Sequence, residues 1–336
     1  MEHEFIKLVK TGKKVTGIIC SNADGKYVQI NASKGVIICT GGYNANKEMM
    51  QALQPEAWKV TGKDVPVGSS NNGSGIKACL WAGAQMDLVH SNVSFNRACV
   101  KPDATTLDNA KWYWFGEQPF MKVNTRGVRF CNESGPYDFM LHSTSMQPGN
   151  CYIQVFDANV KKHTEQLDMV GCCRLFPFDN GAPSNYAFDV NWEKKVLPLI
   201  EEGYIVKADT IEDLAKAFNL PVDAFKAQVE RYNKYAATGV DEEYGKVSYR
   251  ITPIDTPPYY GVKVCAWLLA TQDGIRINTD MHAIDENHDP IEGLYVCGDC
   301  SGGFQGKSYF NLVTGMACGR SMTFGRLAGQ NAAKGI

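Results

Sequence analysis

Two unbroken apolar runs constrain the fold of this chain more than any other feature. Residues 35–39 (Gly-Val-Ile-Ile-Cys) lead directly into Thr40-Gly41-Gly42, and residues 293–297 (Gly-Leu-Tyr-Val-Cys) lead into Gly298-Asp299. An unbroken apolar run is typical of a strand that is buried on both faces, as in the sheet of a layered α/β domain. In such folds ligands lie beyond the carboxyl ends of the strands, so both turns are candidate binding sites.

The segments around the first run predict further parts of the same domain. Three short strand patterns precede it, at residues 5–9, 15–20 and 27–30. Asp24-Gly25 predicts a hairpin turn between the last two, because glycine tolerates the positive φ that such turns need. After the run, Gly73-Ser74-Gly75 opens an alanine-rich helix whose first N–H groups suit an anionic or hydroxyl-rich ligand. A plain helix start explains this motif better when it stands alone.

Residues 90–255 have a different character, with mixed strands, aromatic clusters and helices. A capping-box-like Thr210 predicts one helix start, and Gly239 predicts the end of a long amphipathic helix. The layered pattern then returns, with strands expected at residues 260–266 and 274–278 and a final helix at 315–334. The sequence therefore predicts one domain of residues 1–89 and 256–336, which is interrupted by a second domain of residues 90–255.

Composition excludes several classes of function. Lys and Arg number 34 against 36 Asp and Glu, which excludes a charge pattern spread over the whole chain for binding nucleic acid or anionic lipid. No apolar run approaches the roughly 20 residues of a membrane-spanning helix. The 12 cysteines are dispersed, with close groupings only at Cys172-Cys173 and Cys297-x-x-Cys300, so we expect no metal site. Cysteines within apolar runs favour a reducing compartment, and we expect a cytoplasmic protein.

Several segments together resemble one enzyme family. Residues 32–46, 293–303 and 315–329 occur in the order found in the FAD-dependent fumarate reductase and 3-ketosteroid dehydrogenase superfamily. Residues 123–133 are similar to a hairpin of that family's capping domain, and the helix at 229–233 with the turn at 239–245 is similar to another part of it. The resemblance covers nearly the whole chain.

The resemblance implies FAD as cofactor and hydride transfer at flavin N5. Carried over by position, it implies FAD contacts from the Phe5 backbone, Ser74, Asp299, Ala317 and Cys318. The strand-end turns add Thr40, Gly41, Gly42 and Gly298 to the predicted cofactor-binding set. Ser74 stands where the family usually has Asp, and Asp299 stands where it often has Glu.

The family opens with a Gly-x-Gly-x-x-Gly turn for the FAD pyrophosphate, and this chain shows neither that turn nor the acidic residue that follows it. We therefore expect a partial, N-terminally incomplete Rossmann-like FAD-binding domain at residues 1–89 and 256–336. The expected α+β capping domain at residues 90–255 carries the substrate. A second chain that supplies the absent unit is one candidate partner, and an incomplete flavoprotein that is inactive alone is one reading of the chain.

The predicted substrate site lacks the cationic groups that hold a dicarboxylate in fumarate reductases. Tyr137 stands where the resemblance places the proton-donating Arg, Tyr309 lies in the flavin-side loop, and residues 111–115 are aromatic. We expect an apolar or aromatic substrate, either an enone or acrylate, although core packing also explains the aromatic residues. The predicted reaction is reduction of an activated C=C bond, with Tyr137 or Tyr309 as proton donor and with an electron donor as partner. The reverse reaction, that of a 3-ketosteroid dehydrogenase, is the alternative.

Overall fold

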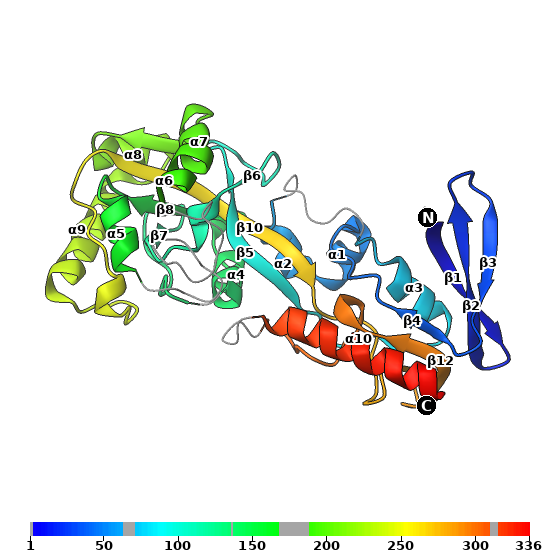
Figure 1. The fold of residues 1–336 in the computed structure, drawn as a ribbon. Helices are drawn as coiled ribbons and strands as arrows, with labels where there is room; N and C mark the ends of the chain where they lie inside the picture. The colour runs from blue at the N-terminus through cyan, green and yellow to red at the C-terminus, as the bar shows by residue number, and fades with distance from the viewer. Residues whose placement is uncertain (1–2, 63–70, 136, 168–187, 310–314) are drawn as a thin grey trace. The chain divides into compact units, whose positions relative to one another are not determined.

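The computed structural model describes residues 3–62, 71–135, 137–167, 188–309 and 315–336, without the side chains of Tyr137, Asp138 and Glu165. The chain divides into two compact units, which we describe separately (Figure 1). Unit 1 consists of Met1–Pro55, Pro66–Val93 and Leu269–Ile336, and unit 2 consists of Glu56–Val65 and Ser94–Leu268. The domain boundaries predicted from the sequence stay a prediction.

Unit 1 contains two small sheets. Strands β1 (His3–Thr11), β2 (Lys14–Asn22) and β3 (Tyr27–Asn31) form an antiparallel meander. The second sheet has the order β11 (His282–Ile284), β12 (Pro290–Val296) and β4 (Val36–Ile38). In this sheet β12 runs parallel to β4, with Leu294 opposite Val36 and Val296 opposite Ile38. The two apolar runs of the sequence are therefore adjacent parallel strands.

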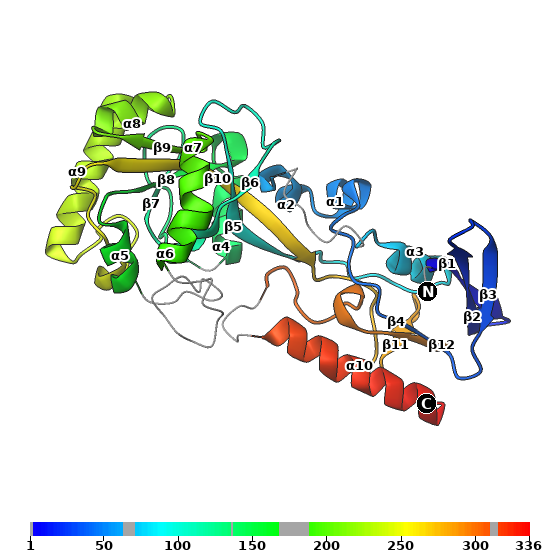
Figure 2. The same cartoon turned by 45° about the horizontal axis from the view of Figure 1, so that its top comes forward.

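Helices of unit 1 lie near the ends of these strands. They are α1 (Lys47–Leu53), α3 (Ser74–Trp81), the short η6 (Gly298–Cys300) and α10 (Met316–Lys334). Figure 2 shows α10 running along β4, β11 and β12. Its Ala328 and Ala332 pack against Met281, Tyr295 and Cys297, so small residues bring this helix close to the sheet.

Unit 2 is built on a larger sheet, parts of whose central strands β5 and β10 belong to unit 1. Its strand order is β6-β5-β10-β8-β7, and β9 also pairs with β10. The strands are β5 (Asn92–Val100), β6 (Lys111–Trp112), β7 (Met121–Val123), β8 (Tyr152–Phe156), β9 (Ile205–Ala208) and β10 (Tyr259–Thr271). The longer elements around it are α2 (Pro55–Val60), α4 (Tyr137–Ser145), α5 (Val160–Gln166), α6 (Phe188–Asn191), η4 (Trp192–Val196), α7 (Leu197–Glu201), α8 (Ile211–Ala217) and α9 (Val222–Thr238). Single turns are η1 (Trp114–Glu117), η2 (Pro148–Asn150) and η5 (Ser248–Arg250).

A buried ion-pair cluster lies inside unit 2. Arg129 donates from Nε and Nη2 to the two carboxylate oxygens of Glu133 (2.7 and 2.8 Å), and from Nη1 and Nη2 to Asp241 (2.9 and 2.8 Å). Lys246 is also buried; its Nζ donates to the Tyr232 hydroxyl (2.7 Å) and lies 3.3 Å from Glu133 Oε2. The cluster joins residues 123–133 and 239–245, two segments of unit 2 on which part of the family resemblance rests.

Several local predictions are confirmed. Gly25 has φ 74° in the turn between β2 and β3. The Thr210 side chain accepts a hydrogen bond from the Asp213 backbone N–H (3.1 Å) at the start of α8. Gly239 ends α9 in the left-handed conformation, with φ 71°. These turn and cap signals depend on local sequence alone, which explains their success.

One predicted burial and one predicted strand are wrong. The run at 35–39 does form a strand, but it has only three residues, of which Ile38 is buried, Val36 is half-buried and Ile37 is 38% exposed. β4 is therefore not covered on both faces. The expected strand at 274–278 forms no continuous ladder: Ile275 pairs with single residues of two other segments, and Ile277 pairs with Ala283.

The helices of the described residues are all too short or too polar to span a membrane.

Candidate cofactor site

The two strand-end turns predicted to bind the cofactor are neighbours in unit 1. The backbone N–H of Cys297 donates to the carbonyl oxygen of Ile38 (3.0 Å), which continues the parallel pairing to the last residue of each run. Thr40-Gly41-Gly42 and Gly298-Asp299 therefore leave the sheet side by side. The start of α3 joins them, because the Gly73 N–H donates to the Gly42 carbonyl oxygen (3.2 Å).

Close packing within the protein explains most glycines of these turns. A Cβ at Gly75 would lie 2.0 Å from Thr40 Oγ1, and a Cβ at Gly42 would lie 2.0 Å from Thr271 Oγ1. These two positions need glycine because of the protein's own side chains. Gly298 differs, because its φ is 73° and, among the described residues other than its chain neighbours, the nearest atom, Ser321 Oγ, would be 3.9 Å from a Cβ. Among these glycines, Gly298 therefore has open space beside its backbone.

The two polar side chains predicted for FAD have different surroundings. Ser74 is half-buried and begins α3, but its N–H already binds Asn72 Oδ1 (2.9 Å). That N–H is therefore not an open donor for a ligand, which agrees with the plain helix start that the motif alone favoured. Asp299 is half-buried after β12, and its Oδ1 accepts a hydrogen bond from Gln272 Nε2 (3.0 Å). Its other oxygen can accept from a ligand hydroxyl.

Arg320 is a candidate cofactor residue that the sequence reasoning missed. It lies in the second turn of α10, is 4% exposed, and donates from Nη2 to the carbonyl oxygens of Gly298 (2.5 Å) and Ser301 (2.7 Å). Its Nε and Nη1 are buried and have no partner among the described residues, and the same holds for Gln272 Oε1. Burial lowers the pKa of Arg320. Buried donors without partners fit a ligand that brings acceptor oxygens, as the carbonyl, phosphate and hydroxyl groups of FAD do.

The remaining predicted cofactor residues are more scattered within unit 1. Ala317 is half-buried and Cys318 is exposed, both in the first turn of α10, one turn before Arg320. Phe5 is half-buried in β1 and pairs with Cys20 of β2. It therefore belongs to the meander sheet, separate from the strand-end turns.

The two tyrosines predicted as proton donors belong to different units. Tyr137 is the first residue of α4 in unit 2, and its side chain lies outside the described part of the structure. Tyr309 is half-buried in unit 1 and is the last described residue before 310–314. These positions do not identify either tyrosine as the proton donor. Cys172-Cys173 also lies outside the described residues.

A buried polar network near the strand ends is a second feature that the sequence did not predict. The Tyr43 hydroxyl donates to Asp273 Oδ2 (2.8 Å), His90 Nδ1 lies 2.6 Å from the same oxygen, and Gln54 Nε2 donates to Asp273 Oδ1 (3.0 Å). Burial raises the pKa of Asp273, although the bonds from Tyr43 and His90 oppose this. Asp273 directly follows Gln272, so the network fixes the segment that positions Asp299.

The aromatic segment at 111–115 belongs largely to the core of unit 2. Tyr113 and Phe115 are fully buried in one hydrophobic cluster, and the Tyr113 hydroxyl donates to Gln154 Oε1 (2.7 Å). Trp112 packs against Trp267 of β10. Core packing therefore accounts for Tyr113 and Phe115, and these two do not form a substrate surface.

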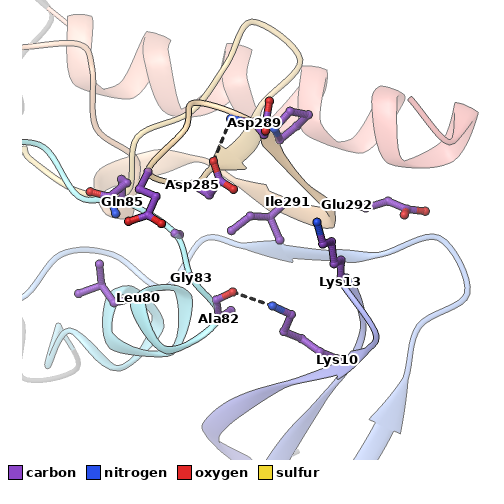
Figure 3. A pocket seen from close by; sticks show the side chains of 13 residues that line it. Lys10, Lys13, Leu80, Ala82, Gly83, Gln85, Asp285, Asp289, Ile291 and Glu292 are labelled. Atoms are coloured by element: carbon purple, nitrogen blue, oxygen red, sulfur yellow. Dashed lines mark hydrogen bonds between the residues drawn. The ribbon is translucent and has the colours of Figure 1, made fainter.

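A separate hollow of about 640 Å³ lies between the meander, the end of α3 and the β11–β12 hairpin (Figure 3). Lysines and carboxylates both line it, and the Lys10 Nζ donates to the Ala82 carbonyl oxygen (2.9 Å). Asp285 is also engaged, because its Oδ1 accepts from the Asp289 N–H (3.0 Å). None of the predicted cofactor residues lines this hollow.

Comparisons with known proteins identify the family. Residues 1–308 match the FAD binding domain family. A vinyl phenol reductase of Lactiplantibacillus plantarum is 27% identical over 333 residues, which cover 96% of this chain and 65% of that protein. A 3-oxosteroid 1-dehydrogenase of Mycobacterium tuberculosis is 30% identical over 323 residues, which cover 89% of this chain and 52% of that protein.

A solved structure agrees with these relatives. The open conformation of a flavocytochrome c3 fumarate reductase is 26% identical, with a TM-score of 0.65, and the match covers 99% of this chain and 52% of that one. The chain thus spans about half to two thirds of the length of these relatives. The α/β fold and the predicted resemblance to fumarate reductases and ketosteroid dehydrogenases are confirmed. The chain belongs to the FAD binding domain family, and its cofactor is FAD.

Proposed function

We propose that the chain is part of an FAD-dependent oxidoreductase that reduces an activated C=C bond in an enone or acrylate-like substrate. The strand-end cluster of unit 1 is the observation that carries the proposal. There the predicted residues Gly298 and Asp299 lie beside Arg320 and Gln272. Arg320 Nε and Nη1 and Gln272 Oε1 are buried and lack hydrogen-bond partners in the described chain. The similarity to a vinyl phenol reductase supports a C=C bond as the reacting group.

Bound FAD would supply a hydride at flavin N5. The residues of this chain have the task of holding it. Asp299 accepts hydrogen bonds from cofactor hydroxyls, and Gln272 keeps the carboxylate in place through its 3.0 Å bond. Arg320 donates from Nε and Nη1 to acceptor oxygens, while its Nη2 holds the turn at Gly298. Each assignment uses a polar atom that the protein leaves available.

The chain also has to deliver a proton to the carbon next to the hydride acceptor. We propose Tyr309 or Tyr137 for this step, because a phenol with an ordinary pKa near 10 can act as a general acid. Tyr309 follows the Gly298-Asp299 turn in the same glycine-rich loop of unit 1. A hydroxyl donor suits a neutral enone, whereas a small dicarboxylate needs cationic partners that the predicted site lacks.

The reverse reaction is the second candidate. The relative that is 30% identical is a 3-oxosteroid 1-dehydrogenase, and the same tyrosines would then act as base and as carbonyl-polarising acid. The substrate and the electron donor or acceptor decide the direction. A third candidate is a chain that binds FAD only together with a partner chain.

A visible absorption spectrum, taken after incubation with FAD and desalting, tests the cofactor part of the proposal. We expect retained flavin absorbance and then anaerobic reoxidation of the reduced protein by enones or aryl acrylates, but not by fumarate. A folded chain without flavin absorbance would instead favour dependence on a partner chain. Reoxidation by fumarate alone would contradict the proposed substrate class.

Matched tyrosine variants test the proton donor. Tyr309→Phe and Tyr137→Phe each remove one hydroxyl, and the exposed Tyr249 provides the control Tyr249→Phe. We expect one of the first two to slow reoxidation by about 100-fold, the usual effect of losing a general acid, with flavin binding unchanged. Equal turnover in all three variants and in the double variant would exclude both tyrosines.

A further inference from the structure

Cysteine side chains gather where β4 and β12 end. Cys39 directly follows β4 and Cys297 directly follows β12, so the parallel register that pairs Ile38 with Val296 places them side by side. The two thiols lie close enough that each shifts the pKa of the other. Cys39 is exposed, whereas Cys297 is 5% exposed and packs against α10. A reagent from solvent therefore reaches Cys39 first, with Cys297 behind it.

The spacing of neighbouring strands suits a disulfide between these residues. Strands in a sheet lie roughly 4.8 Å apart, and disulfides join Cα atoms that are roughly 4.4–6.8 Å apart. The hydrogen bond from Cys297 lowers the pKa of the Cys39 thiol, while the same bond raises the pKa of the Cys297 thiol. Cys39 is thus the better nucleophile of the pair.

The third thiol, Cys300, is engaged elsewhere. It is completely buried, and its Sγ donates to the carbonyl oxygens of Cys297 (3.1 Å) and Ile38 (3.4 Å). Burial raises the pKa of Cys300 to about 11. The Cys300 proton is therefore bound by two backbone carbonyl oxygens. For this reason we take Cys297, not Cys300, as the thiol that reacts with an oxidised Cys39.

We propose that Cys39 and Cys297 form a redox-responsive dithiol, which a peroxide converts to a disulfide across the ends of β4 and β12. The Cys39 thiolate attacks one oxygen of hydrogen peroxide; an S–O bond forms, the O–O bond breaks, and the leaving hydroxide takes a proton to give water. Cys297 sulfur then attacks Cys39 sulfur. The S–S bond forms, the S–O bond breaks, and the released hydroxide takes the Cys297 proton as a second water. Two thiols lose two electrons to one peroxide.

This dithiol does not depend on the proposed function, because both cysteines belong to the chain itself. Its position gives it a consequence for the cofactor site. Cys39 precedes Thr40 and Cys297 precedes Gly298, so the disulfide would tie together the two turns predicted to contact FAD. The modification site and the cofactor site are therefore adjacent.

Peptide mapping of the full chain tests the proposal. The reduced protein is treated with hydrogen peroxide, remaining thiols are blocked with N-ethylmaleimide, and the digest is analysed by mass spectrometry without reduction. We expect a peptide pair joined through Cys39 and Cys297 that dithiothreitol separates. A bridge from Cys39 to Cys300, or peroxide products in which Cys39 stays unbridged, would overturn the proposal.

Variants make the test specific to the pair. In Cys297→Ser, and in Cys297→Ala as a second check on folding, dimedone should capture Cys39 as a sulfenic acid, and no bridge should form. Cys131→Ser removes a half-buried cysteine of unit 2 and should leave the bridge unchanged. We also expect iodoacetamide to label Cys39 about threefold or more slowly in Cys297→Ala, because that variant has no side-chain donor next to the Cys39 thiol. Equal labelling in wild type and Cys297→Ala, together with equal oxidation products in wild type and Cys297→Ser, would refute the pairing.

Discussion

Arg129 in unit 2 and Arg320 in unit 1 are both buried, yet their surroundings differ in kind. Arg129 donates to Glu133 and Asp241 through four hydrogen bonds and also lies 3.2 Å from Glu243. Arg320 donates from Nη2 alone to backbone carbonyls and to Ser301 Oγ, and its other two nitrogens have no partner in the described chain. Carboxylates raise the pKa of Arg129 against the effect of burial, whereas burial lowers the pKa of Arg320.

On our proposal, this difference separates a polar cluster that stabilises the fold from one that a ligand completes. A buried charge is tolerated when the protein supplies its partners, and unit 2 does so around Arg129. A buried donor without a partner costs free energy in the absence of a ligand. The arrangement around Arg320 is therefore understandable when a bound cofactor completes it.

Removing the buried charge of unit 2 should have the largest effect. Arg129→Ala leaves Glu133 and Asp241 buried without their partner, which we expect to lower the free energy of unfolding by about 3–5 kcal/mol. Urea denaturation followed by circular dichroism measures this change. Arg231→Ala is the matched control, because Arg231 is 47% exposed and its pair with Glu243 should contribute at most about 1 kcal/mol. Equal losses in the two variants would contradict a special role for burial.

Acid should weaken the same cluster. Burial alone would raise the pKa of Asp241, but hydrogen bonds from Arg129 and from the Lys246 backbone reverse this and lower it. A carboxyl whose pKa is lower in the folded state stabilises the protein above its unfolded pKa, near 3.9, and loses this contribution as the pH falls. We expect the free energy of unfolding to drop below about pH 5, by about 1–3 kcal/mol for this group. The drop should be smaller in Asp241→Asn, and an identical acid profile would contradict this account.

The matching experiment in unit 1 should give the opposite pattern. Arg320→Met removes a buried cation that has no ion-pair partner within salt-bridge distance in the described chain, but it also removes the Nη2 hydrogen bonds to Gly298 and Ser301. We therefore expect stability without FAD to fall by about 1–2 kcal/mol, less than in Arg129→Ala. We expect the affinity for FAD to fall by about tenfold, which corresponds to about 1.4 kcal/mol. Urea denaturation and titration of flavin fluorescence measure the two effects.

The reverse outcome for Arg320 would remove the contrast between the units. A loss of stability as large as that of Arg129→Ala, with unchanged FAD affinity, would make Arg320 a structural residue. Arg326→Met, at a position further along α10, serves as the control for changing an arginine of this helix. This variant should leave the FAD affinity within about twofold of wild type. Arg326 lies nearly two helical turns after Arg320 and so further from the loops that follow β4 and β12.

The sequence predicted the parts of this site that local patterns encode. Apolar runs that end in Thr40-Gly41-Gly42 and Gly298-Asp299 indicated two strands with binding turns at their ends, and the structure adds that these strands pair in parallel. The sequence could not separate glycines needed for packing from those beside open space. Gly42 and Gly298 look alike in the sequence, yet only Gly42 would place a Cβ against Thr271. That distinction depends on a residue far away along the chain.

The missed residues were hidden for the same reason. Arg320 is one cation in a helix of small residues, and its role becomes visible only when its nitrogens are seen without partners. Gln272 follows β10, and its side chain reaches Asp299, which lies 27 residues further along the chain, only because the fold brings the two together. The lone arginine among small residues in the second turn of α10 was the single available signal. The short exposed β4 was likewise not encoded by its apolar run, because coverage of a strand depends on its neighbours.

The smallest prediction extends the contrast to the helix starts. The Thr210 side chain caps α8 within unit 2, whereas α10 begins at Gly315 with no side-chain cap. Thr210→Ala should lower the free energy of unfolding by about 1 kcal/mol, and Thr210→Ser should restore most of it, because the hydroxyl acceptor returns. Since this cap is complete within the chain, adding FAD should leave the penalty unchanged when denaturation is repeated with saturating cofactor. A penalty that disappears with FAD would mean that the cofactor also acts on unit 2, and the contrast between the Arg129 cluster and the Arg320 cluster would fail.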